Sequence, residues 1–164
     1  MARILKKPLL IIFMLSSIPG VSPVAYAAQS QSLIEGNTAF ALDLYSQVKS
    51  TPGNIFFSPY SISTCLAMVY AGAHGDTEEQ VARVLHFQED RAQIHSSFAG
   101  LQSELNEASK QKGIELKIAN ALWTQKEYPF LPEFLKIAKH KYQANLNQVD
   151  YKLEAERARA EINR

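Results

Sequence analysis

The sequence predicts an α+β fold with several helices before and between its strands. Apolar side chains recur at three- and four-residue steps in most segments after residue 30, which is the spacing of one helix face. Residues 114–122 instead alternate apolar and polar side chains, and residues 144–151 have a weaker strand pattern. Neither strand has a hairpin partner beside it, so we expect both to pair with strands elsewhere. This chain offers few candidates, and we therefore expect it to be part of a larger fold.

Residues 1–28 have the three parts of a secretory signal peptide. Basic residues open the segment, an apolar run from Leu9 to Leu15 follows, and residues 25–27 have the small-x-small pattern of a cleavage site. The alternative, a transmembrane anchor, is disfavoured because the apolar run is too short to span a bilayer. We expect cleavage after Ala27 or Ala28, no membrane anchor, and a secreted or periplasmic protein.

The composition is that of an ordinary soluble domain. Hydrophobic residues make up 46% of the chain, charged residues 20%, and the formal net charge is +1. A net charge this small produces no strong positive electrostatic potential that would attract nucleic acid, so we expect no nucleic-acid partner. Cys65 is the only cysteine, which excludes an internal disulfide. Because its neighbours are apolar, we expect the thiol of Cys65 to be buried and inert. We also expect the protein to be a monomer.

The first half of the chain predicts helices around one short strand. Residues 31–49 form an amphipathic pattern, and the aromatic run of residues 54–57 is typical of a buried strand. Ser58 and Pro59 then open a helix, because a serine side chain can accept a bond from a free N–H and proline fits the first turn. Thr77 to Gln80 has the spacing of a capping box and predicts the start of the next helix.

The second half alternates helices and strands. The clearest helix covers residues 91–112, and the strand of residues 114–122 follows it. Asn120 falls on the apolar face of that strand, where a buried amide needs a hydrogen-bond partner. Pro132 opens another helix, the strand of residues 144–151 comes next, and a charged helix starts at residue 154.

A search for catalytic groups finds no convincing site. The four histidines are scattered, without metal-ligand spacing. Ser58 lies between a predicted strand and a helix, but it lacks the two glycines of a nucleophile elbow. Helix capping explains Ser58 better. We therefore expect neither an enzyme, nor a metal site, nor a cofactor.

Several linked segments resemble the serpins, the serine-protease-inhibitor family. The continuous stretch from Asn54 to Thr77 resembles the family signature around its second helix. Further matches follow the same order and spacing along residues 31–164: Asn37-x-x-Phe40-Ala41, Ile118 to Trp123, Val149-Asp150-Tyr151, and Glu161-Ile162-Asn163. We expect residues 29–164 to be the N-terminal part of a single serpin-like domain, with strands of a large mixed central sheet, truncated at its C-terminal side.

The resemblance implies inhibition by a suicide mechanism. An exposed reactive loop near the C-terminus is cleaved by a serine or cysteine protease, which becomes trapped as an acyl-enzyme when the loop inserts into the central sheet. A polar cluster beneath that sheet, called the shutter, takes part in strand separation. By position, the resemblance assigns this role to five residues: Asn54, Ser58, Ser61, Asn120 and Asn163. Plain helix capping by Ser58 and Ser61 remains the alternative.

The reactive loop lies beyond these 164 residues, so we expect the chain alone to be inactive. The expected role of the whole protein is protease inhibition, with a target protease as its partner. The first alternative is a non-inhibitory serpin that acts as a carrier, chaperone or structural protein. A second alternative is a small helical binding module, which would require this chain to fold alone. We expect poor solubility instead, because sheet edges and apolar faces would stay uncovered.

Overall fold

The computed structural model describes residues 23–110, 113 and 116–164, with side chains described from residue 31 onward. Most of the predicted signal peptide therefore lies outside the described residues. The elements follow in the order α1 (Pro23–Val48), α2 (Pro59–Tyr70), α3 (Asp76–Val84), α4 (Arg91–Ala108), β1 (Ala121–Gln125), α5 (Pro132–Lys141), β2 (Asn145–Val149) and α6 (Ala155–Ile162). This is the predicted α+β mixture, with helices predominating.

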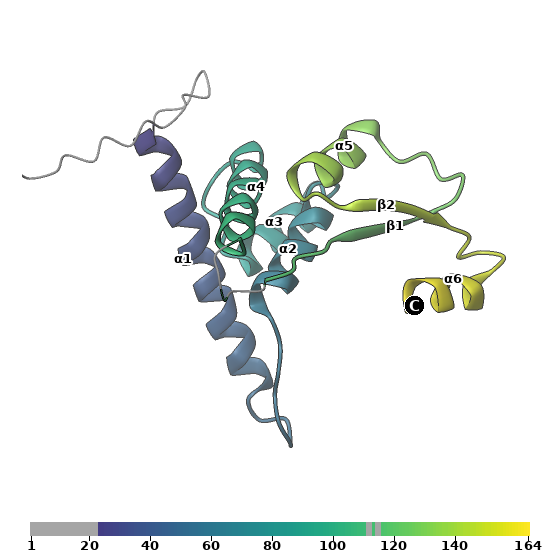
Figure 1. The fold of residues 1–164 in the computed structure, drawn as a ribbon, viewed down its shortest axis with the longest axis horizontal. Coiled ribbons are helices and arrows are strands. Elements are labelled where there is room, and N and C mark those ends of the chain that lie inside the picture. Colours follow the sequence, from purple (N-terminus) through teal and green to yellow (C-terminus); the bar gives the residue numbers. More distant parts are fainter. Residues whose placement is uncertain (1–22, 111–112, 114–115) are drawn as a thin grey trace, which may run out of the picture.

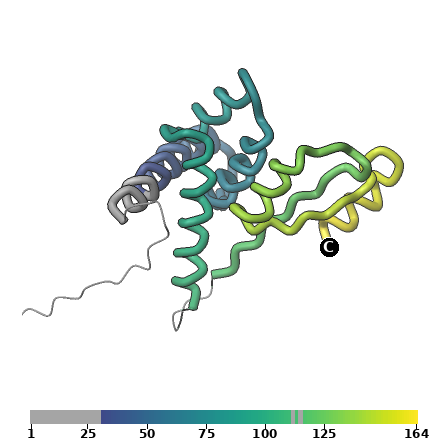
Figure 2. The backbone as a smooth tube through the Cα atoms, turned by 90° about the horizontal axis from the view of Figure 1, so that it is seen from above, coloured from purple at the N-terminus to yellow at the C-terminus, as the bar shows by residue number. Residues whose placement is uncertain are grey.

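Two regions are visible in the ribbon. Helices α1 to α4 gather around one another, and the strands β1 and β2 extend away from them (Figure 1). In that view α5 and α6 lie on opposite sides of the strand pair. Both views place α6 beside the far end of the strands, away from α1 (Figure 1, Figure 2). Helix α5 lies where the two regions meet.

The core forms where α1, α2, α4 and α5 meet. Phe98 of α4 and Tyr142, which follows α5, are its largest fully buried side chains, with almost no surface exposed. Their rings lie 5.6 Å apart between centroids. The other buried members come from all four helices and the segment before β2: Leu33, Ala67, Met68, Ile94, Ala138 and Ala144. Apolar area removed from water is the main stabilising term for such a cluster.

The two strands pair with each other, which corrects the expectation that both need partners elsewhere. Strand β1 lies parallel to β2, in a register that runs from Ala121 opposite Asn145 to Gln125 opposite Val149. Parallel neighbours cannot be joined by a hairpin and need a longer crossover, which α5 supplies. The prediction that neither strand belongs to a hairpin is confirmed, because the two strands form a β–helix–β unit within the chain.

The predicted buried strand at residues 54–57 is absent. This segment has no strand partner, and the side chain of Phe56 is fully exposed. An extended segment becomes a strand only through a ladder of hydrogen bonds to a neighbour. Among the described residues that neighbour is missing, so the aromatic run stays uncovered.

Several element boundaries differ from the predicted ones. Helix α1 begins at Pro23 rather than residue 31, because no helix breaker separates the two positions. The N-cap of α3 is Gly75 with a positive φ of 58°, so the predicted capping box at Thr77 is wrong. Helix α4 ends at Ala108 instead of 112. The predicted strand of residues 114–122 overlaps β1 at only two positions, since residues 116–120 form no strand and residues 114–115 lie outside the described residues.

The turn between β2 and α6 is held by Asp150. Its Oδ1 atom accepts hydrogen bonds from the backbone N–H groups of Lys152 and Leu153, both at 3.0 Å, and from Gln125 Nε2 at 3.3 Å. The bond from Leu153, followed by that from Gln125, lowers the pKa of Asp150 because each favours the charged carboxylate. None of the helices in the described part of the chain is long and apolar enough to cross a membrane.

Candidate functional site

The first two predicted site residues meet at the start of α2. The Oγ atom of Ser61 donates to Ser58 Oγ at 3.0 Å, and the backbone N–H of Ser61 donates to the same oxygen at 3.3 Å. Ser58 is therefore the N-cap that the sequence predicts, with Pro59 in the first turn. Both serines are exposed. Their hydroxyl groups can exchange partners without leaving a buried polar atom unsatisfied.

The other three predicted residues lie apart from this serine pair. Asn54 is exposed in the extended segment before α2. Asn163 is exposed at the end of α6, where its Nδ2 donates to Arg159 O within the same helix at 2.7 Å. Among the described residues, the hydrogen bonds of the five predicted positions thus join only Ser58 and Ser61 to each other.

Asn120 links two elements. It is half-buried just before β1, and its Nδ2 donates to the backbone oxygen of Tyr142 at 2.9 Å. The backbone oxygen of Asn120 in turn accepts from Asn145 N–H at 2.9 Å. The prediction that this amide needs a partner is confirmed. Its bonds fix the start of β1 to the end of α5 and the start of β2.

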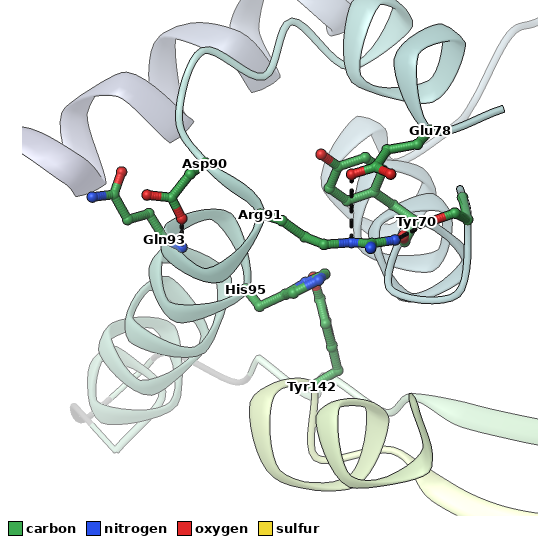
Figure 3. A network of polar contacts seen from close by, with 8 residues as sticks. Tyr70, Glu78, Asp90, Arg91, Gln93, His95 and Tyr142 are labelled. Atoms are coloured by element: carbon green, nitrogen blue, oxygen red, sulfur yellow. Dashed lines mark hydrogen bonds and ion pairs between the residues drawn. The ribbon is translucent and has the colours of Figure 1, made fainter. Parts of the chain in front are cut away.

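Sequence reasoning missed a buried polar pair beside Asn120. The imidazole of His95, on α4, lies 2.7 Å from the hydroxyl of Tyr142 through its Nδ1 atom, and 3% of the surface of His95 is exposed (Figure 3). A signal for it exists in the sequence. His95 falls on the helix face that also carries Arg91, Phe98 and Gln102, at steps of four, three and four residues.

Arg91 joins this face to the end of α2. Its Nη2 donates to the backbone oxygens of Tyr70, at 2.7 Å, and of Ala73. Its Nε lies 3.8 Å from a carboxylate oxygen of Glu78, and its guanidinium carbon lies 5.3 Å from the centre of the Tyr70 ring (Figure 3). The last carbonyls of a helix lack intrahelical partners and carry partial negative charge, so a cation suits this position.

Burial controls the ionisation of the pair. Desolvation lowers the pKa of His95 to about 4, and the positive charges of Arg91 and Lys141 act in the same direction. Burial also raises the pKa of Tyr142 far above its usual range. Both side chains are therefore neutral at pH 7.

The structure corrects one further expectation and gives no catalytic arrangement for Ser58. Cys65 is exposed rather than buried, because it faces outward from α2. The hydroxyl of Ser58 bonds to Ser61 instead of a histidine. His86 pairs with Asp43 at 2.8 Å between Nε2 and Oδ2, linking the turn after α3 to α1. No group of three metal-binding side chains occurs within the described ranges.

Comparison with known proteins adds a family to this geometry. The family model described as "Serpin (serine protease inhibitor)" matches residues 35–164. The leukocyte elastase inhibitor of Xenopus tropicalis is 42% identical over 135 residues, which are 81% of this chain and 35% of that protein. Human serpin B3 is 39% identical over 148 residues, covering 80% of this chain and 37% of its own length. The chain thus spans about a third of the length of the curated relatives that it matches.

Solved serpin structures have the same fold over most of this chain. Cleaved kallistatin complexed with heparin superposes with a TM-score of 0.73 at 28% identity, over 82% of this chain and 40% of that one. Human thyroxine binding globulin with a cleaved reactive loop gives a TM-score of 0.73 at 33% identity, with the same coverage of 82% and 40%. The matched sequence range, the identities and the shared arrangement of helices and strands lead to one conclusion: this chain belongs to the serpin family.

Proposed function

We propose that the protein to which these residues belong inhibits a serine or cysteine protease by the suicide mechanism of the serpins. The observation that carries the proposal is the family match over residues 35–164, together with relatives named as leukocyte elastase inhibitors at 40–44% identity. The reactive loop would lie outside the 164 residues of this chain. The present residues would then supply the sheet and the groups beneath it, not the bait.

Within this mechanism we assign the sheet-opening role to the predicted shutter residues, with Ser58 and Ser61 at its centre. Their mutual hydrogen bond is exposed at the start of α2, so each hydroxyl can find a new partner when strands move. Asn120 supports a related role, because it fixes the entry to β1. Asn54 and Asn163 belong to the proposal by family position alone.

The test is covalent capture of a protease. The whole protein, including the sequence beyond residue 164, would be mixed with a leukocyte elastase and, separately, with a papain-type cysteine protease. We expect a complex that survives denaturing electrophoresis and loss of protease activity at about one inhibitor per enzyme. Cleavage of the protein as an ordinary substrate, without a stable complex, would contradict inhibition. The chain of residues 1–164 is the matched control and should form no complex.

The second candidate is a non-inhibitory carrier. It is favoured by one observation, the likeness to thyroxine binding globulin at 33% identity, a protein whose name states a small-molecule ligand. Titration of the whole protein with an iodinated aromatic ligand, followed by tryptophan fluorescence, distinguishes the candidates. Saturable binding without any protease complex favours the carrier, whereas a complex without saturable binding favours the inhibitor.

We also propose that the protein is exported after removal of residues 1–27 or 1–28, and that it is a monomer. The basic, apolar and small-residue parts of the N-terminus support export. Expression of the whole protein with its own N-terminus, followed by N-terminal sequencing of the exported product, tests this. The product should begin at Ala28 or Gln29, and an intact Met1 would contradict it. Sedimentation of the same product gives its oligomeric state.

A further inference from the structure

We propose that His95 and Tyr142 form a pH-sensitive tie that holds α5 and the start of β1 against α4, and that protonation of His95 releases it. The proposal concerns the junction between the helical region and the strand pair and does not depend on protease inhibition. It rests on three features of the junction: the path of its hydrogen bonds, the partners of the two imidazole nitrogens, and the charges around the ring.

The hydrogen bonds make Tyr142 the shared anchor of three elements. Its hydroxyl lies 2.7 Å from His95 Nδ1 on α4, and its backbone oxygen accepts from Asn120 Nδ2 at 2.9 Å. Tyr142 itself follows α5 directly and is completely buried. A shift of this one residue therefore moves the end of α5 relative to α4 and loosens Asn120 at the same time. The core contact of its ring with Phe98 would open with it.

The imidazole has a partner for only one nitrogen. A neutral histidine needs one donor and one acceptor contact, but a protonated ring carries N–H groups on both nitrogens. The Nε2 atom of His95 is buried without a hydrogen-bond partner among the described residues. Whichever nitrogen gains the proton, the charged ring carries an Nε2–H group that meets no acceptor among the described residues, and burying this charge is costly in an apolar surrounding.

The charged groups around the ring are also unfavourable to a cation. Arg91 lies one turn earlier on α4, and Lys141 of α5 reaches α4 through a 3.1 Å bond from its Nζ to Ser96 Oγ. Burial lowers the pKa of His95 to about 4, and both positive charges act in the same direction. The aromatic neighbours Tyr70 and Tyr142 are neutral phenols. The carboxylate of Glu78, from α3, faces Arg91 instead.

The direction of the effect follows from linkage. An opened junction exposes His95 to water, where its pKa returns toward the ordinary value of about 6.5. Between pH 6.5 and 4 the open state therefore binds more protons than the closed state, and acid favours opening. The tie is intact above pH 6.5, weakens as the pH falls, and has lost its contribution below pH 4.

The first experiment is an NMR titration of the imidazole protons in the whole protein. The other histidines of residues 1–164 are internal references, since His74 and His140 are exposed and His86 is only half-buried. The resonance that disappears in His95→Asn, and again in His95→Gln, is assigned to His95. We expect the resonance of His95 to report a pKa lowered from the ordinary value of about 6.5 toward 4. A pKa of His95 at or above the ordinary value would overturn the proposal.

The second experiment tests release of the junction. His95→Asn keeps a polar atom near the position of Nδ1 for the Tyr142 hydroxyl but cannot be protonated. Hydrogen exchange of peptides from α5 and residues 116–120 would be compared between wild type and variant at the same pH, which cancels the intrinsic rate. We expect similar exchange at pH 7, and at pH 5 faster exchange in the wild type, on the order of tenfold.

The matched control is His140→Asn, because His140 is exposed on α5 and not part of the tie. This variant should keep the acid response of the wild type. An acid response that is unchanged in His95→Asn would show that another group controls the junction and would overturn the proposal. A loss of the response in His140→Asn but not in His95→Asn would overturn it equally.

Discussion

The helical region and the strand region of this chain are stabilised in different ways. Where α1, α2, α4 and α5 meet, apolar side chains from four helices exclude water together. The pair β1 and β2 is held by backbone hydrogen bonds, and most of its side chains are at least partly exposed; Thr124 and Val149 are the buried ones. In α6 only Ala158 is buried. The helical region is therefore stabilised mainly by side-chain packing, and the strand region mainly by backbone hydrogen bonds.

The polar side chains of the two regions also differ in burial and in the elements that their bonds connect. In the helical region His95 and Tyr142 are buried and Arg91 is half-buried, and all three bond across elements. On α6 the ion pairs join residues of the same helix at the surface. We therefore expect substitutions in the first region to destabilise the protein far more than those in the second, and the predictions below test this order.

The largest effect is expected from Phe98→Ala. Phe98 is buried against Tyr142 and Phe87 in the helical core, and its removal leaves a cavity. Truncation of a buried phenylalanine costs about 3–5 kcal/mol. Urea unfolding of the whole protein followed by circular dichroism measures it. Leu153→Ala is the control from the strand region, since Leu153 lies between β2 and α6 with 86% of its surface exposed, and it should change the free energy of unfolding little. Equal effects would break the distinction between the regions.

The sequence predicted most helices well because their signals are local. The positions of α2 and α5 follow from a proline in the first turn, and Ser58 caps α2 as its side-chain chemistry requires. The buried face of α4 was found from its periodicity, with Ile94 and Phe98 at its centre. The order of these elements along the chain also agreed with that of the family it resembles.

Non-local contacts explain what the sequence could not predict. The run of residues 54–57 has strand-forming side chains, yet pairing depends on a neighbour that its own residues do not specify. Cys65 has apolar neighbours in sequence, but exposure depends on which face of α2 meets the core. The tie between His95 and Tyr142 joins residues 47 positions apart, so the periodicity of α4 can place His95 on the buried face but cannot identify Tyr142 as its partner. Asn120 was predictable because a polar residue interrupts an apolar alternation.

The next effect concerns the polar anchor of the helical region. Arg91→Lys keeps the positive charge but loses the fork that donates to the backbone oxygens of both Tyr70 and Ala73. Because hydrogen bonds to charged groups are worth about 1.5–3 kcal/mol, we expect a loss in that range. Thermal unfolding at low and high salt is the measurement. A variant as stable as the wild type at both salt concentrations would show that the positive charge at position 91 is sufficient and that the fork contributes nothing.

A smaller effect distinguishes the two interpretations of Ser58. Ser58→Ala removes the oxygen that accepts from Ser61 and should destabilise the protein by about 1 kcal/mol. Ser58→Asp restores a capping acceptor and should restore stability. If Ser58 also acts when the sheet opens, Ser58→Asp will still change the fraction of protease trapped as a covalent complex. A variant with normal stability and normal trapping would leave capping as the complete role of Ser58.

The smallest effect is expected at the far end of the strand region. Arg159 Nη2 lies 2.9 Å from a carboxylate oxygen of Glu156 on the exposed surface of α6. Exposed helix pairs three or four residues apart contribute only about 0.2–0.5 kcal/mol, because water competes for both charges and two long side chains must be ordered. Glu156→Gln should therefore shift the urea midpoint only slightly, and Glu133→Gln on α5, whose pair with Lys136 is longer at 3.9 Å, should shift it no more. A loss near that of Arg91→Lys would mean that α6 is held by contacts that its exposed surface does not suggest, and that the strand region is not the weaker of the two.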